Sequence, residues 1–541
     1  MILRRDVLKW AASGLGVLGL SPRVEADTAP ASAGAPVPGA ASVVATPAAA
    51  TPAAIPPSAP QGSTPPTPAF DGGVVVERAR QLAKKPHEAL SAPLPGAFAN
   101  LTYDQYVGIR TRSGTAVWAD DNLGFAIEPL HRGFLFTAPM TINVVENGAV
   151  RRLGYAASQF DFGKVQPPDN LPDLGFSGFR VLHARTGKGL VDSALFQGAS
   201  FFRALANGQN FGLTARALTI RTADPRGEEF PAVREVWIER PSLANDVLVI
   251  HALVDSDSMT GAYRFTLRPG DITIIDTECT LFTRNAADFY GLGGMTAMFL
   301  FGPINRKTAD DVREGVFEVS GLQILNGNNE WLWRPVTNPS TLQVSVFVDA
   351  NPRGFGLLQR ERNFNLLQDD EQHWELRPSL WIEPINDWGE GSVELVEIPT
   401  DTENNENVVC FWRPKAVLDA GAEASFAYRQ FWCWTPPDRP PLPVVTDTRV
   451  GRIAGSKRRR FMVEFTGDIF ADPQRSQDAK PMLTASVGVI AATKTFVSRE
   501  RKTFRVMFDM DFGSDTLAEL RLLLEAGGKP ASETWLYRWT A

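Results

Sequence analysis

Short runs of alternating apolar and polar residues fill most of the chain between positions 116 and 436. A period of two is typical of β-strands that bury one face. The clearest runs are Phe134–Val144, Phe196–Arg203, Leu213–Arg221, Val233–Glu239, Asp246–Asp255, Ala262–Leu267 and Asp271–Phe282. Turn signals separate them, for example Asn147-Gly148, Asn207-Gly208 and Pro269-Gly270. This spacing predicts a large antiparallel β-sandwich over residues 71–436.

The C-terminal part repeats this periodicity behind a proline-rich segment. Residues 437–443 predict a linker between two domains. The 98 residues that follow, 444–541, hold about seven strand candidates. They include Arg460–Phe465, Met482–Ser486, Thr503–Asp509, Leu517–Leu524 and Ser532–Trp539. This length and spacing predict a small immunoglobulin-like β-sandwich.

The N-terminal 70 residues follow neither pattern. The first 26 contain, in order, the pair Arg4-Arg5, the dipeptide Leu8-Lys9, the short apolar run Trp10–Leu20 and the cleavage signal Val24-Glu25-Ala26. This arrangement predicts a twin-arginine signal peptide and a periplasmic destination. Residues 27–70, rich in Ala, Pro, Ser and Thr, predict a disordered tether. A helix is expected next, over Val74–Leu90.

Charge and composition exclude several kinds of partner. The formal net charge of −7 gives no general attraction to nucleic acid. Beyond the signal peptide, no run reaches the roughly 18 apolar residues of a membrane span, so we expect no stable membrane insertion. The five histidines lack metal-ligand spacing, so we expect neither metal nor cofactor. The three cysteines are expected in the core, with a disulfide between Cys410 and Cys433 left open.

One polar stretch stands out between two strand candidates. Residues 383–414 carry a turn around Trp388, a strand that ends at Pro399, and then Asn404-Asn405-Glu406-Asn407 before the chain returns to apolar residues. Hydrogen-bonding groups between core strands, with tryptophans nearby, are a common way to build a carbohydrate site. The same composition also fits a solvated loop with Asx turns.

Several other residues could likewise belong either to a carbohydrate site or to the structural framework. Glu318 lies within the apolar run Val316–Val319, where an acid on a half-buried strand suits acid–base chemistry, although an outward-facing position fits equally well. Trp331, Trp333 and Trp388 could stack on glucose rings or fill the core, and we expect one of the first two to line a cleft. Asp387 is first a turn former. Arg334 and Arg377 could bind sugar hydroxyls or form structural ion pairs.

Several longer phrases carry a family resemblance. They include Asp173–Val181, Gln197–Arg203, Thr260–Phe265, Glu330–Pro335, Asn351–Gln359, Arg377–Trp381, Trp388–Gly391, Val396–Pro399 and Glu533–Tyr537. With these phrases the chain resembles, over residues 75–541, the periplasmic glucan biosynthesis proteins of the OpgG/OpgD (MdoG/MdoD) type. The twin-arginine signal is similar to that of the D-type branch.

The resemblance implies a galactose-mutarotase-like sandwich with a cleft, followed by an immunoglobulin-like domain. Hydrolytic members are inverting endo-β-1,2-glucanases with one aspartate as general acid and another as general base. The acid phrase matches Glu406–Val409 and the base phrase matches Phe317–Leu322, so the resemblance places Glu406 and Glu318 in these roles. Both are one methylene longer than aspartate. Trp374 stands where the family has a tyrosine, so it offers no hydroxyl as a proton relay.

Two functions therefore stay open. One is an enzyme on β-1,2-linked glucan, an inverting endo-glucanase or a transglycosylase. The other is a non-catalytic glucan-binding factor that guides backbone or branch assembly. A β-glucan polysaccharide or oligosaccharide is the expected partner in both cases, and a homodimer is possible. A lyase or epimerase-like enzyme is less favoured because the sequence offers no obvious Tyr, His or Lys base.

Overall fold

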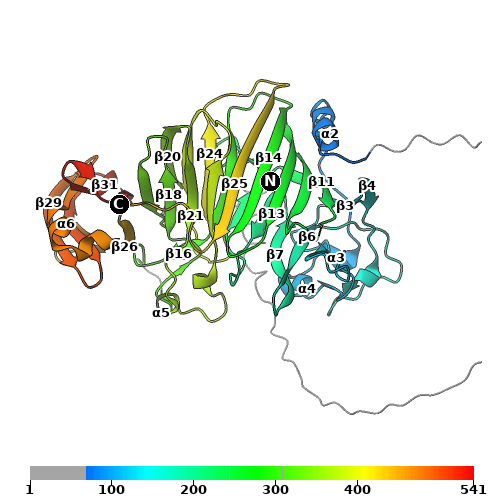
Figure 1. The fold of residues 1–541 in the computed structure, drawn as a ribbon, viewed down its shortest axis with the longest axis horizontal. Coiled ribbons are helices and arrows are strands. Elements are labelled where there is room, and N and C mark those ends of the chain that lie inside the picture. Colours follow the sequence, from blue (N-terminus) through cyan, green and yellow to red (C-terminus); the bar gives the residue numbers. More distant parts are fainter. Residues whose placement is uncertain (1–68, 243, 307–309) are drawn as a thin grey trace, which may run out of the picture. The chain divides into compact units, whose positions relative to one another are not determined.

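The computed structural model describes residues 69–541 except 243 and 307–309. The predicted signal peptide (1–26) and all but the last two residues of the predicted tether (27–70) lie outside the described residues. The described chain is mostly β and almost entirely antiparallel, as the period of two predicted (Figure 1). The pairs β11–β3 and β19–β33 are parallel.

The first large sheet has ten strands. In spatial order they are β2 (Phe125–Leu130), β6 (Gly178–Arg185), β7 (Gly189–Gln197), β8 (Phe201–Ala204), β9 (Thr214–Arg216), β15 (Tyr290–Ala297), β24 (Val408–Pro414), β23 (Glu390–Glu397) and β20 (Gln343–Ala350), with β10 (Thr219–Ile220) also paired to β15. Strands distant in sequence are neighbours in the middle of this sheet. The order β8-β9-β15-β24 is the part that builds the site described below.

The second large sheet has fifteen strands. Its order is β28 (Lys480–Ala485), β31 (Leu517–Ala526), β33 (Thr534–Thr540), β19 (Trp331–Pro335), β18 (Gly321–Leu325), β21 (Gly354–Leu358), β22 (Ser379–Pro384), β25 (Glu423–Cys433), β14 (Thr273–Thr283), β13 (Met259–Arg268), β12 (Leu248–Asp255), β11 (Ala232–Glu239), β3 (Thr141–Glu146) and β4 (Ala149–Arg152), with β32 (Lys529–Pro530) paired to β31. The first three strands belong to the C-terminal 98 residues. The β19–β33 pair therefore joins strands from before and after the predicted linker into one sheet.

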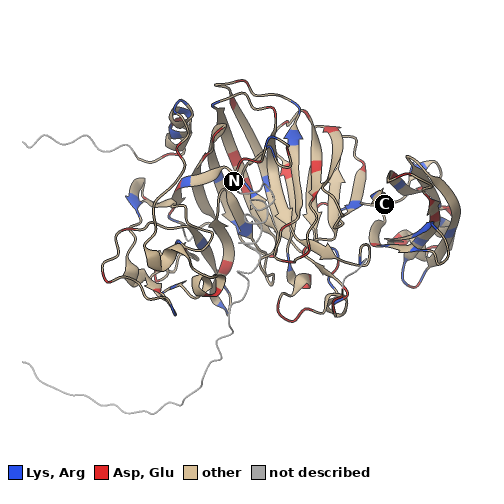
Figure 2. Cartoon of the chain, turned by 180° about the vertical axis from the view of Figure 1, so that it is seen from behind, with Lys and Arg blue, Asp and Glu red and all other residues tan. Residues whose placement is uncertain are grey.

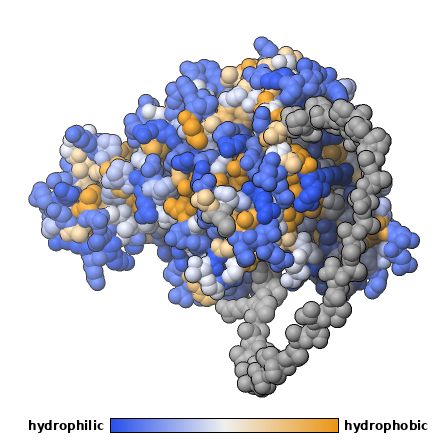
Figure 3. Space-filling view, turned by 45° about the vertical axis from the view of Figure 1, so that its right-hand side comes forward, coloured by the Kyte–Doolittle hydropathy of each residue, from blue (hydrophilic) through white to orange (hydrophobic). Residues whose placement is uncertain are grey.

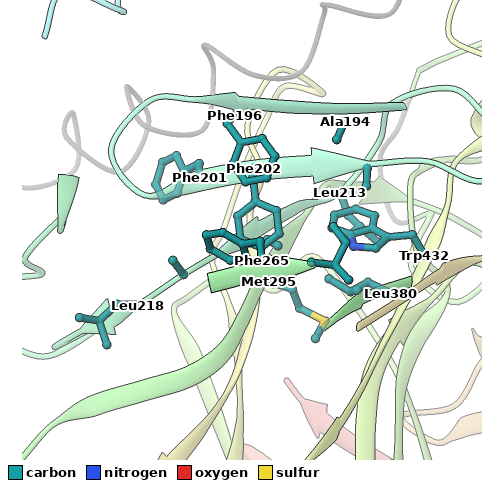
Figure 4. Close-up of a cluster of buried hydrophobic side chains, with 14 of the residues drawn as sticks. Ala194, Phe196, Phe201, Phe202, Leu213, Leu218, Phe265, Met295, Leu380 and Trp432 are labelled. Atoms are coloured by element: carbon teal, nitrogen blue, oxygen red, sulfur yellow. The ribbon is translucent and has the colours of Figure 1, made fainter. Parts of the chain in front are cut away.

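The main core lies between the two large sheets. Aromatic rings from β7, β8 and β13 pack together, with Phe196 centred 5.2 Å from Phe202 and 5.6 Å from Phe265 (Figure 4). Met295 of β15 and Trp432 of β25 belong to the same buried cluster. Because each sheet contributes one apolar face, the alternating pattern is satisfied by a face-to-face sandwich.

The C-terminal strands form a second sandwich. A four-stranded sheet, β26 (Val444–Arg452), β27 (Arg459–Thr466), β30 (Thr503–Asp511) and β29 (Val489–Ser498), shares a core with β28, β31 and β33. Phe461, Phe508 and Trp535 meet in that core. Seven strands in two packed sheets fit the predicted immunoglobulin-like architecture.

The helices are short. They are α2 (Gly73–Ala83), α3 (Gly96–Ala99), α4 (Tyr103–Val107), α5 (Phe364–Leu367) and α6 (Pro473–Asp478). The two-stranded pairs β1 (Arg110–Thr111) with β5 (Phe160–Asp161) and β16 (Phe299–Phe301) with β17 (Val316–Phe317) complete the fold. The helix predicted to run to Leu90 ends at Ala83. Pro86 explains this end, because proline disfavours helical backbone at Lys85 and supplies no N–H of its own.

The remaining features of the fold are its cysteines, the length of its helices and its surface. Cys279, Cys410 and Cys433 are buried and unpaired, so the disulfide left open between Cys410 and Cys433 does not form. Within the described part of the chain, no helix is long and apolar enough to cross a membrane. Basic and acidic residues are interspersed on the cartoon (Figure 2), and hydrophilic residues with smaller apolar areas cover the face seen in Figure 3.

Candidate functional site

Glu406 lies at the end of the polar loop that precedes β24, and three side chains donate hydrogen bonds to it. Arg203 Nη2 lies 2.5 Å from its Oε1, and the Thr214 hydroxyl lies 2.6 Å from the same oxygen. The Thr296 hydroxyl donates to Oε2. An arginine and two hydroxyls together stabilise a negative charge on this carboxylate.

Adjacent strands of the ten-stranded sheet supply these donors. Arg203 comes from β8, Thr214 from β9 and Thr296 from β15. Thr214 and Thr296 are directly opposite each other in the β9–β15 pair, so their hydroxyls flank one point. Because β24 is the next strand in order, the loop that leads into it places Glu406 at that point.

The loop around Glu406 is itself fixed by Asn407. The Asn407 side-chain amide donates to the carbonyls of Phe299 and Ile398, and its oxygen accepts the Phe299 N–H. These bonds satisfy three backbone groups where the ladder is interrupted between β23 and β24. The asparagine-rich phrase is therefore partly structural, as the Asx-loop interpretation allowed.

Glu318 follows β17 and faces the same cluster. Its main-chain N–H donates to the Met298 carbonyl at 2.9 Å, and the Met298 N–H lies 3.2 Å from Oε2. Burial raises the pKa of Glu318, and the charge of Glu406 raises it further, whereas Arg377 and Arg203 oppose the shift. The two carboxylates, 88 positions apart in sequence, therefore interact electrostatically.

Arg377 and Trp374 adjoin Glu318. The Arg377 guanidinium lies 5.0 Å from the centre of the Trp374 ring, and its Nη2 donates to Gln372 Oε1 at 2.9 Å. Burial lowers the pKa of Arg377, while the nearby Glu318 charge raises it. The Trp374 indole N–H donates to Asp369 at 2.9 Å, which fixes the ring at the position where the resemblance implies a tyrosine.

Arg313 joins three segments beside this cluster. Its Nη1 lies 2.6 Å from Asp369 Oδ2, and its Nη2 lies 2.6 Å from Glu403 Oε2. Asp311 accepts two further bonds from the same guanidinium. Glu403 is three residues before Glu406, so Arg313 links the loop that carries Glu406 to the segment that carries Trp374.

The cluster is closed. Glu318 is 2% exposed and Glu406 8%, and Arg203 and Arg377 are at most 2% exposed. Two carboxylates and two arginines thus share one desolvated volume. Neighbouring charges affect one another strongly in such a volume, because water does not screen them.

The structure places Arg334 and Trp333 elsewhere. Arg334 Nη2 lies 3.0 Å from Glu397 Oε2 in an ion pair that is almost fully buried, which is the structural use the sequence allowed. Trp333 lies under the Arg360 guanidinium, 3.5 Å from the ring centre. Arg360 in turn binds Glu533 at 2.7 Å, so this face of Trp333 helps join the C-terminal strands to the large sheet. Trp333 does line a hollow there, together with Phe299, Phe317 and Ser320, so the hollow borders the segment that carries Glu318.

Trp331, Trp388 and Asp387 lie apart from the carboxylates. Trp331 stacks on Trp381 at 5.9 Å in a cluster of its own. Trp388 is 4% exposed and packs edge-on against Tyr428 at 5.7 Å. Asp387 accepts the Gly389 N–H at 2.7 Å, as a turn former does. Among the predicted site residues, the structure brings together Glu318, Glu406, Trp374 and Arg377.

The residues that sequence reasoning missed are Arg203, Thr214, Thr296 and Arg313. A signal existed for Arg203, because it ends an apolar strand run and a buried arginine requires an anionic partner. The partner itself lies 203 positions away. Nothing in the described residues groups three metal-ligating side chains.

The fold and the cluster define a two-sheet β-sandwich protein with a buried acidic pair held by arginines. A family profile described as "Periplasmic glucan biosynthesis protein, MdoG" matches residues 70–539, and the chain belongs to this family. It is 44% identical over 480 residues to glucans biosynthesis protein G of Vibrio cholerae serotype O1, covering 88% of this chain and 87% of that one. The protein of the same name from Rhodopseudomonas palustris is 44% identical over 478 residues, or 87% and 94% of the two chains.

Solved structures are much less similar. A galactose mutarotase related enzyme from Lactobacillus acidophilus shares 7% identity at a TM-score of 0.20, covering 44% of this chain and 96% of that one. No argument about function follows from so weak a likeness. The family membership supports a role in periplasmic glucan biosynthesis.

Proposed function

We propose that this protein processes β-1,2-linked glucan in the periplasm, as an inverting endo-glucanase or a transglycosylase. The observation that carries the proposal is that Thr296 donates a hydrogen bond to Glu406 and the Met298 N–H donates one to Glu318, so both buried carboxylates lie at the end of β15. Glu406 is the general acid, which gives its proton to the glycosidic oxygen. Glu318 is the general base, which takes a proton from the attacking water or sugar hydroxyl.

The contacts set a condition on this mechanism. A general acid must carry a proton before bond cleavage, but Arg203 and two threonine hydroxyls stabilise charge on Glu406. The substrate must therefore enter a cluster that is now closed and displace part of this donor set. Trp374 and Arg377, which adjoin the pair, are the substrate-binding residues we retain beside it.

The experiment uses the mature protein, residues 27–541, with linear β-1,2-glucan as substrate. We expect shorter or transferred products from the wild type, and none from Glu406→Gln or Glu318→Gln. Asp401→Asn is the matched control, because it is an exposed carboxylate in the same loop. Wild-type product formation by Glu406→Gln contradicts the assignment of the acid.

The second candidate is a non-catalytic glucan-binding factor that guides backbone or branch assembly. The burial of both carboxylates favours it, since a fully hydrogen-bonded ion pair is also a structural device. This function predicts that the glucan binds, measured by calorimetry, without any change in chain length. Affinity should then be largely kept in Glu318→Gln.

Two further proposals concern the export route and the oligomeric state. The Arg4-Arg5 pair supports export by the twin-arginine route and the D-type branch of the family. Replacing both arginines with lysines should leave the precursor in the cytoplasm, and unchanged periplasmic accumulation contradicts this route. A homodimer is proposed as the assembly, and a monomeric mass by light scattering at micromolar concentration contradicts it.

A further inference from the structure

The edge strand β29 in the C-terminal sandwich is unusual because both of its faces are exposed. Every residue from Val489 to Val497 is exposed. Its apolar members are 64% (Val489), 37% (Ile490), 51% (Phe496) and 43% (Val497) exposed. An edge strand with this much uncovered apolar surface marks a contact site.

Basic residues lie beside this strand in register. Arg452 pairs with Arg459, Arg459 with Met510, and Met510 with Ile490 across four neighbouring strands. At about 4.8 Å per strand, Arg459 and Ile490 are about 10 Å apart at their backbones. The turn between β26 and β27 adds Lys457 to the same end of the sheet.

Two of these cations form ion pairs, and Asp509 and Asp511 also interact with Lys494 and Lys457. Arg458 pairs with Asp511 at 3.3 Å, and Arg460 with Asp509 at 2.7 Å. Within the described residues, no ion pair is formed by Arg452, Lys457, Arg459 or Lys494. The strand and its surroundings therefore combine apolar side chains with excess positive charge, although the whole chain carries −7.

Strand addition by another protein fits this edge poorly. The register of β29 against β30 shifts between Ile490 and Ala492, and Lys494 lies in the middle of the strand. A bulge and a central lysine are devices by which natural edge strands prevent pairing. A soluble anionic polymer would need the cations but not the exposed Phe496 and Val489.

We propose that β29 and the β26–β27 turn form a docking surface for an anionic lipid bilayer. Val489, Lys494 and Phe496 pair with outward-facing residues of β30, so they share the outer face of the sheet. The apolar side chains of Val489 and Phe496 enter the headgroup region, while Lys457 and Lys494 bind lipid phosphates. The contact is peripheral and requires no spanning segment. It is independent of the proposed glucan chemistry and would hold the large sandwich close to a membrane.

The test is co-sedimentation of the full mature chain with vesicles. The probe is phosphatidylcholine vesicles with added phosphatidylglycerol, compared with pure phosphatidylcholine. We expect binding to the anionic vesicles alone, lost at about 1 M salt, where the Debye length falls to about 3 Å. Equal binding to both vesicle types, or no binding to either, overturns the proposal.

Variants of the basic residues test whether the positive charges contribute to vesicle binding. Each basic side chain near an anionic surface contributes about a fivefold gain in affinity, so Lys457→Glu with Lys494→Glu should weaken binding at least about 25-fold. Lys164→Glu with Lys188→Glu is the charge-matched control on exposed residues of the large sandwich. An equal loss in the control overturns the assignment of the surface.

Apolar variants test the other half and separate a bilayer from other partners. Val489→Asp with Phe496→Asp should abolish vesicle binding, whereas Val348→Asp, at an 85% exposed position on β20, should not. All variants change exposed side chains, and thermal unfolding checks that they fold. If the apolar variant still binds vesicles, the surface recognises a polyanion and the proposal is wrong. If the variant's one effect is to disrupt a dimer seen by light scattering, the surface binds a second copy of the chain instead.

Discussion

Arg203→Met should leave the Glu406 carboxylate buried without its cationic partner. The two side chains are 2% and 6% exposed, so solvent cannot replace the lost guanidinium. Removing one member of a buried pair costs about 3–5 kcal/mol. The two threonine hydroxyls remain, so we expect the lower end of this range, about 3 kcal/mol in the free energy of unfolding.

The assay is urea unfolding at neutral pH, followed by tryptophan fluorescence. The change in midpoint at constant m-value gives the loss of stability. The double variant Arg203→Met/Glu406→Gln should regain most of it, because the orphan charge is then absent. Arg264→Met is the matched control, since its ion pair with Glu278 is solvent-exposed and should contribute little.

A single variant that loses less than about 1 kcal/mol, or a double variant no more stable than the single one, refutes the reasoning that this ion pair is desolvated and coupled.

Three further substitutions probe residues around the carboxylates and the C-terminal strands. Burial raises the pKa of Glu318, so the stability that its protonated form contributes is present at low pH and lost as the pH rises through the raised pKa. Glu318→Gln should therefore be more stable than wild type at pH 7 but not at pH 4. Urea unfolding at the two pH values measures this difference. Arg313→Gln should speed amide exchange around Asp369 and Glu403 by about tenfold or more, and Arg306→Gln should not. Trp333→Ala should cost about 3–5 kcal/mol because it empties a packed position; unchanged stability with weakened glucan binding would instead support a sugar-stacking role.

The sequence predicted the type of fold because strand periodicity is local. Residues two apart on a strand share a face, and Trp331 and Trp333 lie on the same face of β19. Alternation does not identify the residues that pack on that face, because parts of both faces of the large sheet are buried. Trp333 contacts Arg360, and Trp331 contacts Trp381, through packing that no local pattern encodes.

The site was predictable where one segment carries the signal and not where distant strands meet. Glu406 was identified from its phrase, but its partners Arg203, Thr214 and Thr296 come from strands ordered by the sheet topology. Trp388 lies in a polar turn, where the sequence favours an exposed ring. Its ring instead points into the core, since burial of a large aromatic surface outweighs the polarity of its neighbours.

The most direct test of the central claim is a proton NMR time course of the mature protein with linear β-1,2-glucan. Inversion requires that the first-formed reducing ends have the α configuration, and Glu406→Gln should give no such signal. First-formed ends of β configuration, or wild-type rates from Glu406→Gln, would contradict it.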